Sequence, residues 1–337
     1  MSEHFRKFSS IDQFSNVVKG VRMHCKKYEK PLPKITFYGS VKLHGTNACI
    51  AFIGDEVQFQ SRERTLSYES DNAGFCNWGL QNIDKIKQIG ELLKSWAPLI
   101  DKAYLYGEWC CGNVQAGVAL NQIAEKKFAV FELVLVDFEG KEHILTDLTE
   151  HEWMSKILPN ILVIDTIVPS IELEIDFNEP HLVQNYLLEK TLEVEAECPF
   201  AKHFGASGTG EGLVWRGKIG EDHYLKFKTK GEKHSVSKVK TVRELTDAEI
   251  ASKENAKEFV EYALTDNRLK QGIDKLSEMG LEVDIKSTGA FLKWIGSDVL
   301  KECTDVLVAS NIERKDVMPV ISDKARQWFM NYLNENA

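Results

Sequence analysis

Lys42-Leu43-His44-Gly45-Thr46-Asn47 is the stretch that decides the fold of this chain. It places one lysine at the end of an apolar run of β-forming residues, 35–41, and follows it at once with a glycine turn. A lysine held between a strand and a tight turn is a candidate covalent nucleophile. An amine attacks phosphorus only in its neutral form, so we expect burial or nearby positive charge to favour that form. The alternative is a solvated lysine that happens to precede a turn.

The bulk properties of the chain predict a two-domain globular protein. A length of 337 residues is long for one hydrophobic core, and no apolar run approaches the ~20 residues of a membrane span. The N-terminus lacks the apolar segment of a secretory signal. The seven cysteines form no Cys-x-x-Cys pair, which indicates reduced thiols and no zinc site. We therefore expect a cytoplasmic protein (host cytoplasm if the chain is viral), without a membrane partner and monomeric.

The charge distribution points to a local site for phosphates. A formal net charge of −9 argues against a protein that coats nucleic acid. Residues 226–243, however, carry seven lysine or arginine residues against the single acid Glu232. We interpret this segment as a phosphate site, with a solvated linker as the alternative for its later lysines.

Residues 1–240 predict an α+β domain of antiparallel sheets flanked by helices. Apolar residues with helical spacing occupy 82–93 and 148–157. Short β-forming runs, bounded by turn residues, predict the strands. The expected strands are 35–38, 47–52, 57–60, 103–106, 128–137, 211–215 and 224–228.

Residues 245–337 predict a smaller, all-α C-terminal domain. This part is rich in Ala, Leu, Glu and Lys with helical periodicity, and Thr246 begins a potential helix cap. Its main interruptions are Gly280, Gly289, Gly296 and Pro319. The expected helices are 247–262, 266–279, 288–300, 310–318 and 322–333.

Several side chains suited to nucleotidyl transfer follow one another in order, each on a predicted strand or at its end. They are Lys42, Arg62, Glu108, Phe128, Glu211, Lys226 and Lys228. The period of a strand places Lys226 and Lys228 on one face, where they could hold a phosphate and favour a neutral Lys42. Carboxylates near phosphates hold Mg²⁺, and an aromatic ring can stack on a purine. Taken singly, each residue also fits a core or salt-bridge role.

The ordered set resembles the covalent nucleotidyltransferase superfamily of ATP-dependent ligases and capping enzymes. The Lys-x-His-Gly-Thr-Asn form at 42–47 is similar to the RNA ligase 2 family, because DNA ligases and capping enzymes usually have aspartate where His44 stands. The segment Phe5-Arg6-Lys7-Phe8-Ser9-Ser10-Ile11 also resembles the start of these ligases. The resemblance implies an ATP-grasp-like ligase adenylation domain over 1–240. In the C-terminal region only the helical type and the size of the domain resemble the family.

Within this resemblance, the nucleotide-binding roles can be assigned by position. Lys42 would become the lysyl-adenylate. Arg62 would contact the nucleotide and the RNA end, Glu108 would hold the adenosine ribose, and Phe128 would stack on adenine. Asn47 would help to assemble the RNA-bound state.

The phosphate and metal roles follow in the same way. Glu211 would engage the divalent metal, Mg²⁺. Lys226 and Lys228 would bind the α-phosphate, and at least one of them should assist adenylylation. Two departures from the family pattern stand out: Cys110-Cys111 after the motif glutamate, and the acidic stretch 137–199, which we interpret as an insertion.

The resemblance implies an ATP-dependent RNA ligase. Lys42 takes AMP from ATP, the AMP passes to a 5′-phosphate of RNA, and a 3′-hydroxyl attacks that activated end. The expected partner is RNA with 3′-hydroxyl and 5′-phosphate ends, with a nicked duplex as one form, in RNA repair. The alternatives are a DNA ligase or capping-type enzyme, and a non-catalytic nucleic-acid-binding protein of the same fold. Loss of Lys42, Glu211 or Lys226 would mark the last class, and all three are present.

Overall fold

A computed structural model describes residues 4–115, 117–220, 223–231, 259–309 and 314–336. The chain divides into two compact units, Met1–Gly231 and Glu232–Ala337. The expected domain limits at 240 and 245, most of the helix expected over 247–262, and its cap at Thr246 lie outside the described residues. No helix in the described part of the chain is long and apolar enough to cross a membrane.

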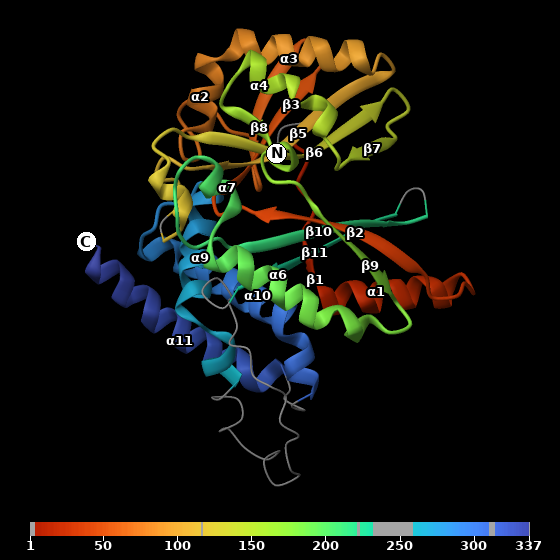
Figure 1. Cartoon of the computed structure of the whole chain (residues 1–337). Coiled ribbons are helices and arrows are strands. Elements are labelled where there is room, and N and C mark those ends of the chain that lie inside the picture. The colour runs from red at the N-terminus through yellow and green to blue at the C-terminus, as the bar shows by residue number, and fades with distance from the viewer. Residues whose placement is uncertain (1–3, 116, 221–222, 232–258, 310–313, 337) are drawn as a thin grey trace. The chain divides into compact units, whose positions relative to one another are not determined.

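The first sheet of unit 1 has the strand order β1-β11-β10-β2-β9 (Figure 1). All of its pairings are antiparallel except that between β1 and β11, which is parallel. Residues Lys34–Lys42 form β2, so the lysine of the opening motif is the last residue of a central strand. The other strands are β1 (Asp12–Gln13), β9 (Ile171–Asp176), β10 (Gly212–Ile219) and β11 (His223–Lys230).

The second sheet has the order β4-β3-β5-β6-β7, and β8 pairs in parallel with β6. Its strands β3 (Thr46–Ile53) and β5 (Ile100–Cys110) are neighbours, which places the end of the glycine turn beside Glu108. The remaining strands are β4 (Glu56–Ser61), β6 (Lys127–Asp137), β7 (Glu142–Leu145) and β8 (Ile161–Val163).

Helices cover the outer faces of both sheets (Figure 1). Helices α1 (Phe14–Lys27) and α6 (Gln184–Ala196) pack on the first sheet, while α3 (Ile83–Trp96) packs on the second. Shorter helices connect these elements: α2 (Phe75–Gln81), α4 (Trp153–Ile157), α5 (Ile164–Ile167), α7 (Pro199–His203), η1 (Ala119–Gln122), η2 (Thr149–His151) and η3 (Pro180–Val183).

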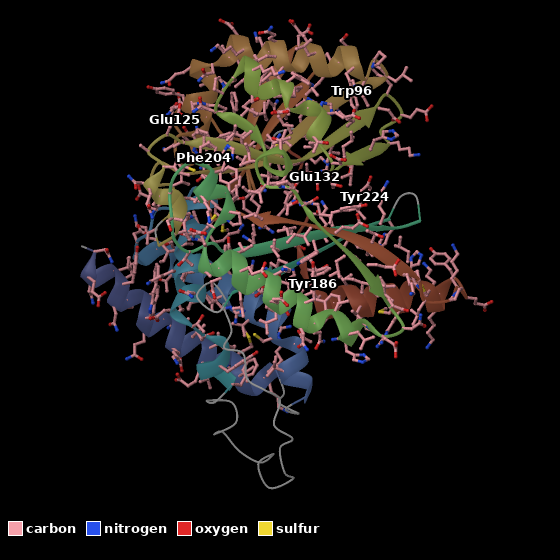
Figure 2. All side chains as sticks on the ribbon, in the orientation of Figure 1. Trp96, Glu125, Glu132, Tyr186, Phe204 and Tyr224 are labelled. Atoms are coloured by element: carbon pink, nitrogen blue, oxygen red, sulfur yellow. The ribbon has the colours of Figure 1, made fainter. Side chains whose placement is uncertain are left out.

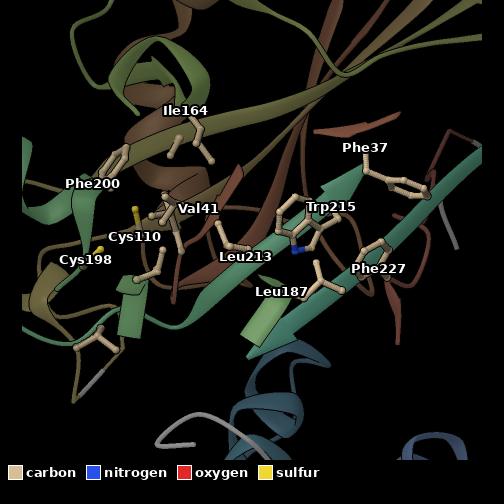
Figure 3. Packing of buried hydrophobic residues seen from close by; sticks show 14 of the residues in the cluster. Phe37, Val41, Cys110, Ile164, Leu187, Cys198, Phe200, Leu213, Trp215 and Phe227 are labelled. Carbon is tan, nitrogen blue, oxygen red and sulfur yellow. The ribbon is translucent and has the colours of Figure 1, made fainter. Parts of the chain in front are cut away.

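The core beneath the first sheet is aromatic. Trp215 stacks on Phe227 with ring centroids 6.1 Å apart, and Phe37 lies 5.3 Å from the same ring. Figure 3 shows these rings beside Leu187 of α6. All four side chains are nearly or fully buried. This packing fixes β2, β10 and β11 side by side and therefore fixes the side chains on their opposite face.

The predicted α+β class, with antiparallel sheets and a helical C-terminal region, is confirmed. Each predicted strand is present, and most are longer than expected. The interpretation of residues 137–199 as an insertion stays a prediction. This stretch supplies β9 to the edge of the first sheet, and β7 and β8 to the second.

Unit 2 is helical in its described residues. Its helices α9 (Asp266–Glu278), α10 (Thr288–Ala309) and α11 (Arg314–Glu335), with the short η5 (Ile285–Ser287), enclose their own apolar cluster. Helix α11 runs through Pro319, where we expected an interruption. The apolar residues Val317, Ile321 and Phe329 keep helical spacing across the proline and are buried on one face. Their burial outweighs the hydrogen bond that the proline removes.

The buried Arg268 offers a test of what stabilises unit 2. Its side chain is fully buried, and its Nε donates to Asp298 at 2.9 Å. We expect Arg268→Leu to cost about 3–5 kcal/mol in the free energy of unfolding, because it leaves acids beside it without their cation. The exposed pair Lys324–Glu261 provides the control: Lys324→Gln should cost about 0–1 kcal/mol. Denaturant unfolding of the full chain measures both, and equal effects would contradict the prediction.

Candidate active site

Three strands of the first sheet place two lysines on either side of one glycine. Gly212 at the start of β10 pairs with Lys42 of β2 on one side and with Lys230 of β11 on the other. Side chains of directly paired residues project from the same face of a sheet. Lys42 and Lys230 therefore point together into the space between the two sheets.

Position 212 requires glycine for two reasons: the conformation of its backbone and the close approach of a neighbouring carbonyl. Its φ is +144°, and a Cβ there would lie 2.1 Å from the carbonyl oxygen of Thr229. Only glycine fits both conditions. The bend that it makes carries the side chain of Glu211 between the two lysines.

Glu211 joins the cations of the site. Its Oε2 accepts from the Nζ of Lys42 at 2.6 Å, and its Oε1 lies 3.0 Å from the Nζ of Lys230. The Nδ1 of His44 is 3.4 Å from Oε2. The carboxylate is only 2% exposed. Burial by itself would raise the pKa of Glu211, but the ammonium groups of Lys42 and Lys230 and the His44 ring hold it well below its usual value.

The second sheet contributes another carboxylate. Glu108 of β5 accepts a hydrogen bond from the backbone N–H of Gly45 at 2.9 Å. A Cβ on Gly45 would lie 2.4 Å from the carbonyl oxygen of Trp109, so the turn must be glycine to approach this strand. Burial raises the pKa of Glu108 to about 7, with Lys42 opposing and Glu211 adding to the shift. Glu108 thus changes charge near neutral pH.

Asn47 lies beside Glu108 on the neighbouring strand. Its side-chain oxygen Oδ1 is buried and has no hydrogen-bond partner among the described residues. A buried acceptor without a partner is costly, which makes it a candidate contact for a ligand or an ion. Asn47, Glu108 and Glu211 therefore supply hard oxygen donors around Lys42.

Lys226 does not lie beside Lys42. It pairs with Arg216 across the strands, two rows along β11 from Lys230, and its ammonium contacts the buried carboxylate of Glu132 of β6. Glu132 lies between the two sheets in Figure 2. The ring of Phe8 lies 5.0 Å from the Lys226 ammonium. Burial lowers the pKa of Lys226, although the Glu132 carboxylate opposes this shift.

Lys228 is half-buried in the row between Lys226 and Lys230. The three lysines share one face of β11, and Phe227 is buried on the opposite face, as strand periodicity predicted for 226–228. Sequence reasoning placed Lys230 in the basic segment 226–243 but not among the individual site residues, because it ended the strand at 228. Continuing the same period by one step would have found it.

The expected stacking role of Phe128 does not fit this structure. The ring is fully buried on the helix-covered face of the second sheet, with Phe75 at 5.1 Å, and so offers no surface to a purine. A register shift in the pairing of β5 with β6 turns Phe131 toward the first sheet instead. Phe131 is half-buried, and the Arg216 guanidinium lies 5.6 Å from its ring.

Ser40 and Arg216 lie on the inter-sheet side and were not anticipated. Ser40 accepts from Arg216 Nη1 at 3.0 Å and donates to Asp165 of α5 at 2.7 Å. Arg62 was anticipated and follows β4 directly. It is half-buried and forms no hydrogen bond or ion pair with the residues that the structure describes.

The site thus consists of a lysine beside a buried acid, flanked by cations and by oxygen donors between two antiparallel sheets, a combination chemically suited to phosphoryl or nucleotidyl transfer. Residues 35–240 match the family model described as RNA ligase. That match covers more than half of the sequence, and the chain belongs to the RNA ligase family. The resemblance to RNA ligases is confirmed.

Solved structures of RNA ligase from Naegleria gruberi are similar to the chain. A lysine-to-methionine mutant of that ligase with AMP and Mn aligns with a TM-score of 0.46 and 15% identity over 69% of this chain and 58% of that chain. A lysine-to-alanine mutant with ATP and Mn gives 0.45 and 16%, with the same coverages. The chain therefore spans less than two thirds of the length of these ligases. No curated protein shows significant sequence similarity to it.

The titration of Glu108 gives a pH test. Its pKa of about 7 lies above the ordinary value, so the carboxylate is lost as the pH falls through 7. If the ionised carboxylate accepts the ribose hydroxyls, AMP binding should weaken about tenfold between pH 8 and pH 6. Isothermal titration with AMP measures this. Glu108→Gln should bind AMP more weakly and without that dependence, and an equally steep profile in the variant would contradict the assignment.

The different partners of Lys230 and Lys226 predict different effects of their loss. Lys230→Met leaves Glu211 in contact with Lys42, so we expect a small loss of stability and about a hundredfold slower self-adenylylation. Lys226→Met leaves Glu132 as a buried, unpaired charge and should cost about 3–5 kcal/mol of stability. Adding Glu132→Gln should restore most of that stability. Denaturant unfolding and the adenylylation rate separate the two cases, and the reverse pattern would refute this reading of the contacts.

Proposed function

We propose that this chain is an ATP-dependent RNA ligase that seals 3′-hydroxyl and 5′-phosphate ends of RNA through a covalent lysyl-AMP, in RNA repair. The observation that carries the proposal is the contact of Lys42 with Glu211, 2.6 Å apart, at the Lys-x-His-Gly turn of a chain in the RNA ligase family. In this proposal residues 1–240 form the adenylyltransferase domain and residues 245–337 the helical C-terminal domain, in a monomeric cytoplasmic protein.

The first step is attack of the Lys42 amine on the α-phosphorus of ATP, with pyrophosphate as the leaving group. Lys42 contacts Glu211 in the structure, so it must part from the carboxylate before it attacks the phosphorus as a neutral amine. Lys230 then remains with Glu211 and keeps positive charge beside the reacting phosphate. Lys228, one row along β11, adds to that charge.

In the later steps Lys42 releases the AMP that it accepted in the first step. The P–N bond of the lysyl-AMP breaks as an RNA 5′-phosphate oxygen attacks, and Lys42 returns to the amine. The RNA 3′-hydroxyl then attacks the activated 5′-phosphate, and AMP leaves. Every step builds charge on phosphoryl oxygens, which the cations of β11 stabilise. Arg62 would contact the RNA end in these steps.

Divalent metal binding fits the donors present. Glu211, Glu108 and the unpartnered Oδ1 of Asn47 are oxygen ligands of the type that Mg²⁺ takes, and a bound ion would neutralise phosphate charge. In the described residues, no group of three or more His, Cys, Asp or Glu side chains is placed to hold a metal ion. The remaining ligands would then be water and phosphate oxygens, as Mg²⁺ usually retains.

The alternatives make different demands on the same site. A DNA ligase or capping-type enzyme would share the adenylylation or guanylylation chemistry but differ in acceptor. A non-catalytic binding protein would not need Lys42 and Lys230 held on one buried carboxylate, an arrangement that costs desolvation energy. The buried ion cluster therefore favours the catalytic proposal.

The test is label transfer from α-labelled ATP with Mg²⁺, comparing the wild type with Lys42→Ala. We expect label that survives denaturation in the wild type and none in the variant, because the phosphoramidate forms only on Lys42. Pyrophosphate treatment beforehand removes AMP already bound. Absence of label in the treated wild type would refute the proposal. Sealing of nicked RNA but not of the matching DNA nick would then identify the acceptor.

A further inference from the structure

Helix α1 carries a concentration of positive charge outside the active site. Between Lys19 and Lys34 the chain has six lysine or arginine residues and one acid, Glu29, in a protein whose formal net charge is −9. Arg22, Lys26, Lys27 and Lys30 are exposed, and we call these four the basic α1 surface. None of the four forms an ion pair with a residue that the structure describes.

The end of the helix holds this surface in one shape. The N–H of Lys30 donates to the carbonyl of Cys25 at 2.9 Å, and that of Glu29 to the carbonyl of Lys26. Glu29 has a φ of +50°, the left-handed conformation that closes a helix in this way. The backbone of Lys30 is thereby folded back against the last turn of the helix. Within the helix, Arg22 and Lys26 are four residues apart, about 6 Å along its axis.

Two exposed non-charged side chains lie within the same surface. Met23 is 73% exposed and Tyr28 is 54% exposed. The Lys27 ammonium lies 5.2 Å from the Tyr28 ring. The Tyr28 hydroxyl and the lysine ammonium groups are hydrogen-bond donors of the kind that contact phosphate oxygens of a nucleic-acid backbone.

The position of α1 fixes which part of a substrate it could meet. Phe14 packs on Phe227 at 5.0 Å, so the helix lies on the face of the first sheet that points away from Lys42. The surface leads into Lys34, and β2 then runs nine residues to Lys42. At ~3.3 Å per residue this separates the two ends of β2 by roughly 26 Å. A duplex covers that length with roughly eight base pairs, at about 3.4 Å each.

We propose that the basic α1 surface binds the phosphate backbone of a duplex RNA arm, at least about eight base pairs from the ends being joined. This inference rests on the proposed function for its choice of RNA. Phosphate contacts of this kind carry no sequence information and position the duplex. The surface therefore adds affinity for long substrates without touching the reacting groups.

The test compares two triple variants with equal charge change. Arg22→Gln, Lys26→Gln and Lys30→Gln remove three cations from the basic α1 surface. Lys85→Gln, Lys87→Gln and Lys156→Gln remove three exposed cations of α3 and α4, on the side of the second sheet. Binding of nicked duplex RNA with arms of 6 or 20 base pairs is measured by fluorescence anisotropy at several salt concentrations. Self-adenylylation is measured in parallel.

On the 20-base-pair arms, we expect the α1 variant to bind at least about tenfold more weakly at 0.15 M salt and its log–log salt slope to fall by about 3. On 6-base-pair arms the two triple variants should bind alike. Glu29→Gln, which removes the one acid of the segment, should tighten binding to the long arms about twofold. Self-adenylylation should be unchanged in all of them.

Equal weakening by both triple variants, or a loss in the α1 variant that is the same for both arm lengths, overturns the inference. So does an α1 variant that binds both RNAs normally but loses binding to vesicles of anionic phospholipid, which would assign the surface to a membrane. Because RNA binding is measured without ligation, these outcomes remain readable even if the wild type fails to adenylylate. The failure of the proposed function and of this inference are therefore distinguishable.

Discussion

The contact between the Lys42 ammonium and the Glu211 carboxylate is the interaction on which the arrangement of the site depends. The two residues are 169 positions apart in the sequence and meet because β2 and β10 are neighbours. The pair is largely removed from water, so its desolvation cost is high, and Lys230 offsets part of it from the other side. The Trp215–Phe227 packing beneath the sheet provides the rigidity that keeps the three groups in contact.

The charged residues between the two sheets form two groups. Near Lys42, burial holds the pKa of Glu108 near neutrality, whereas the ammonium groups of Lys42 and Lys230 hold the pKa of Glu211 well below its usual value. Farther along the strands, Lys226 is matched by Glu132, while Arg216 is linked through Ser40 to Asp165. Lys42 and Lys230 are thus grouped around one acid, at the position where a phosphate would lie.

Local patterns in the sequence predicted much of this fold. The strand-ending lysine and the alternation of lysines with Phe227 are short-range features that lie as expected, and the strand expected from 211 begins at Gly212. Local patterns did not predict the place of Lys230 in the site or the direction in which Phe128 points. One depends on where a strand ends, and the other on a register shift between β5 and β6 that reverses which aromatic faces the site. The Lys226–Glu132 pair and the strand β9 depend on long-range pairing, which single-residue propensities do not encode.

The masking of Lys42 by Glu211 has a chemical consequence for the resting protein. The Lys42 nitrogen is engaged by a carboxylate oxygen at 2.6 Å, so part of the space around it is already occupied. Acyl phosphates, thioesters and other electrophiles therefore have less access to this nitrogen than to that of a lysine without such a partner. The same residue that organises the site thus also limits which molecules can reach its lysine.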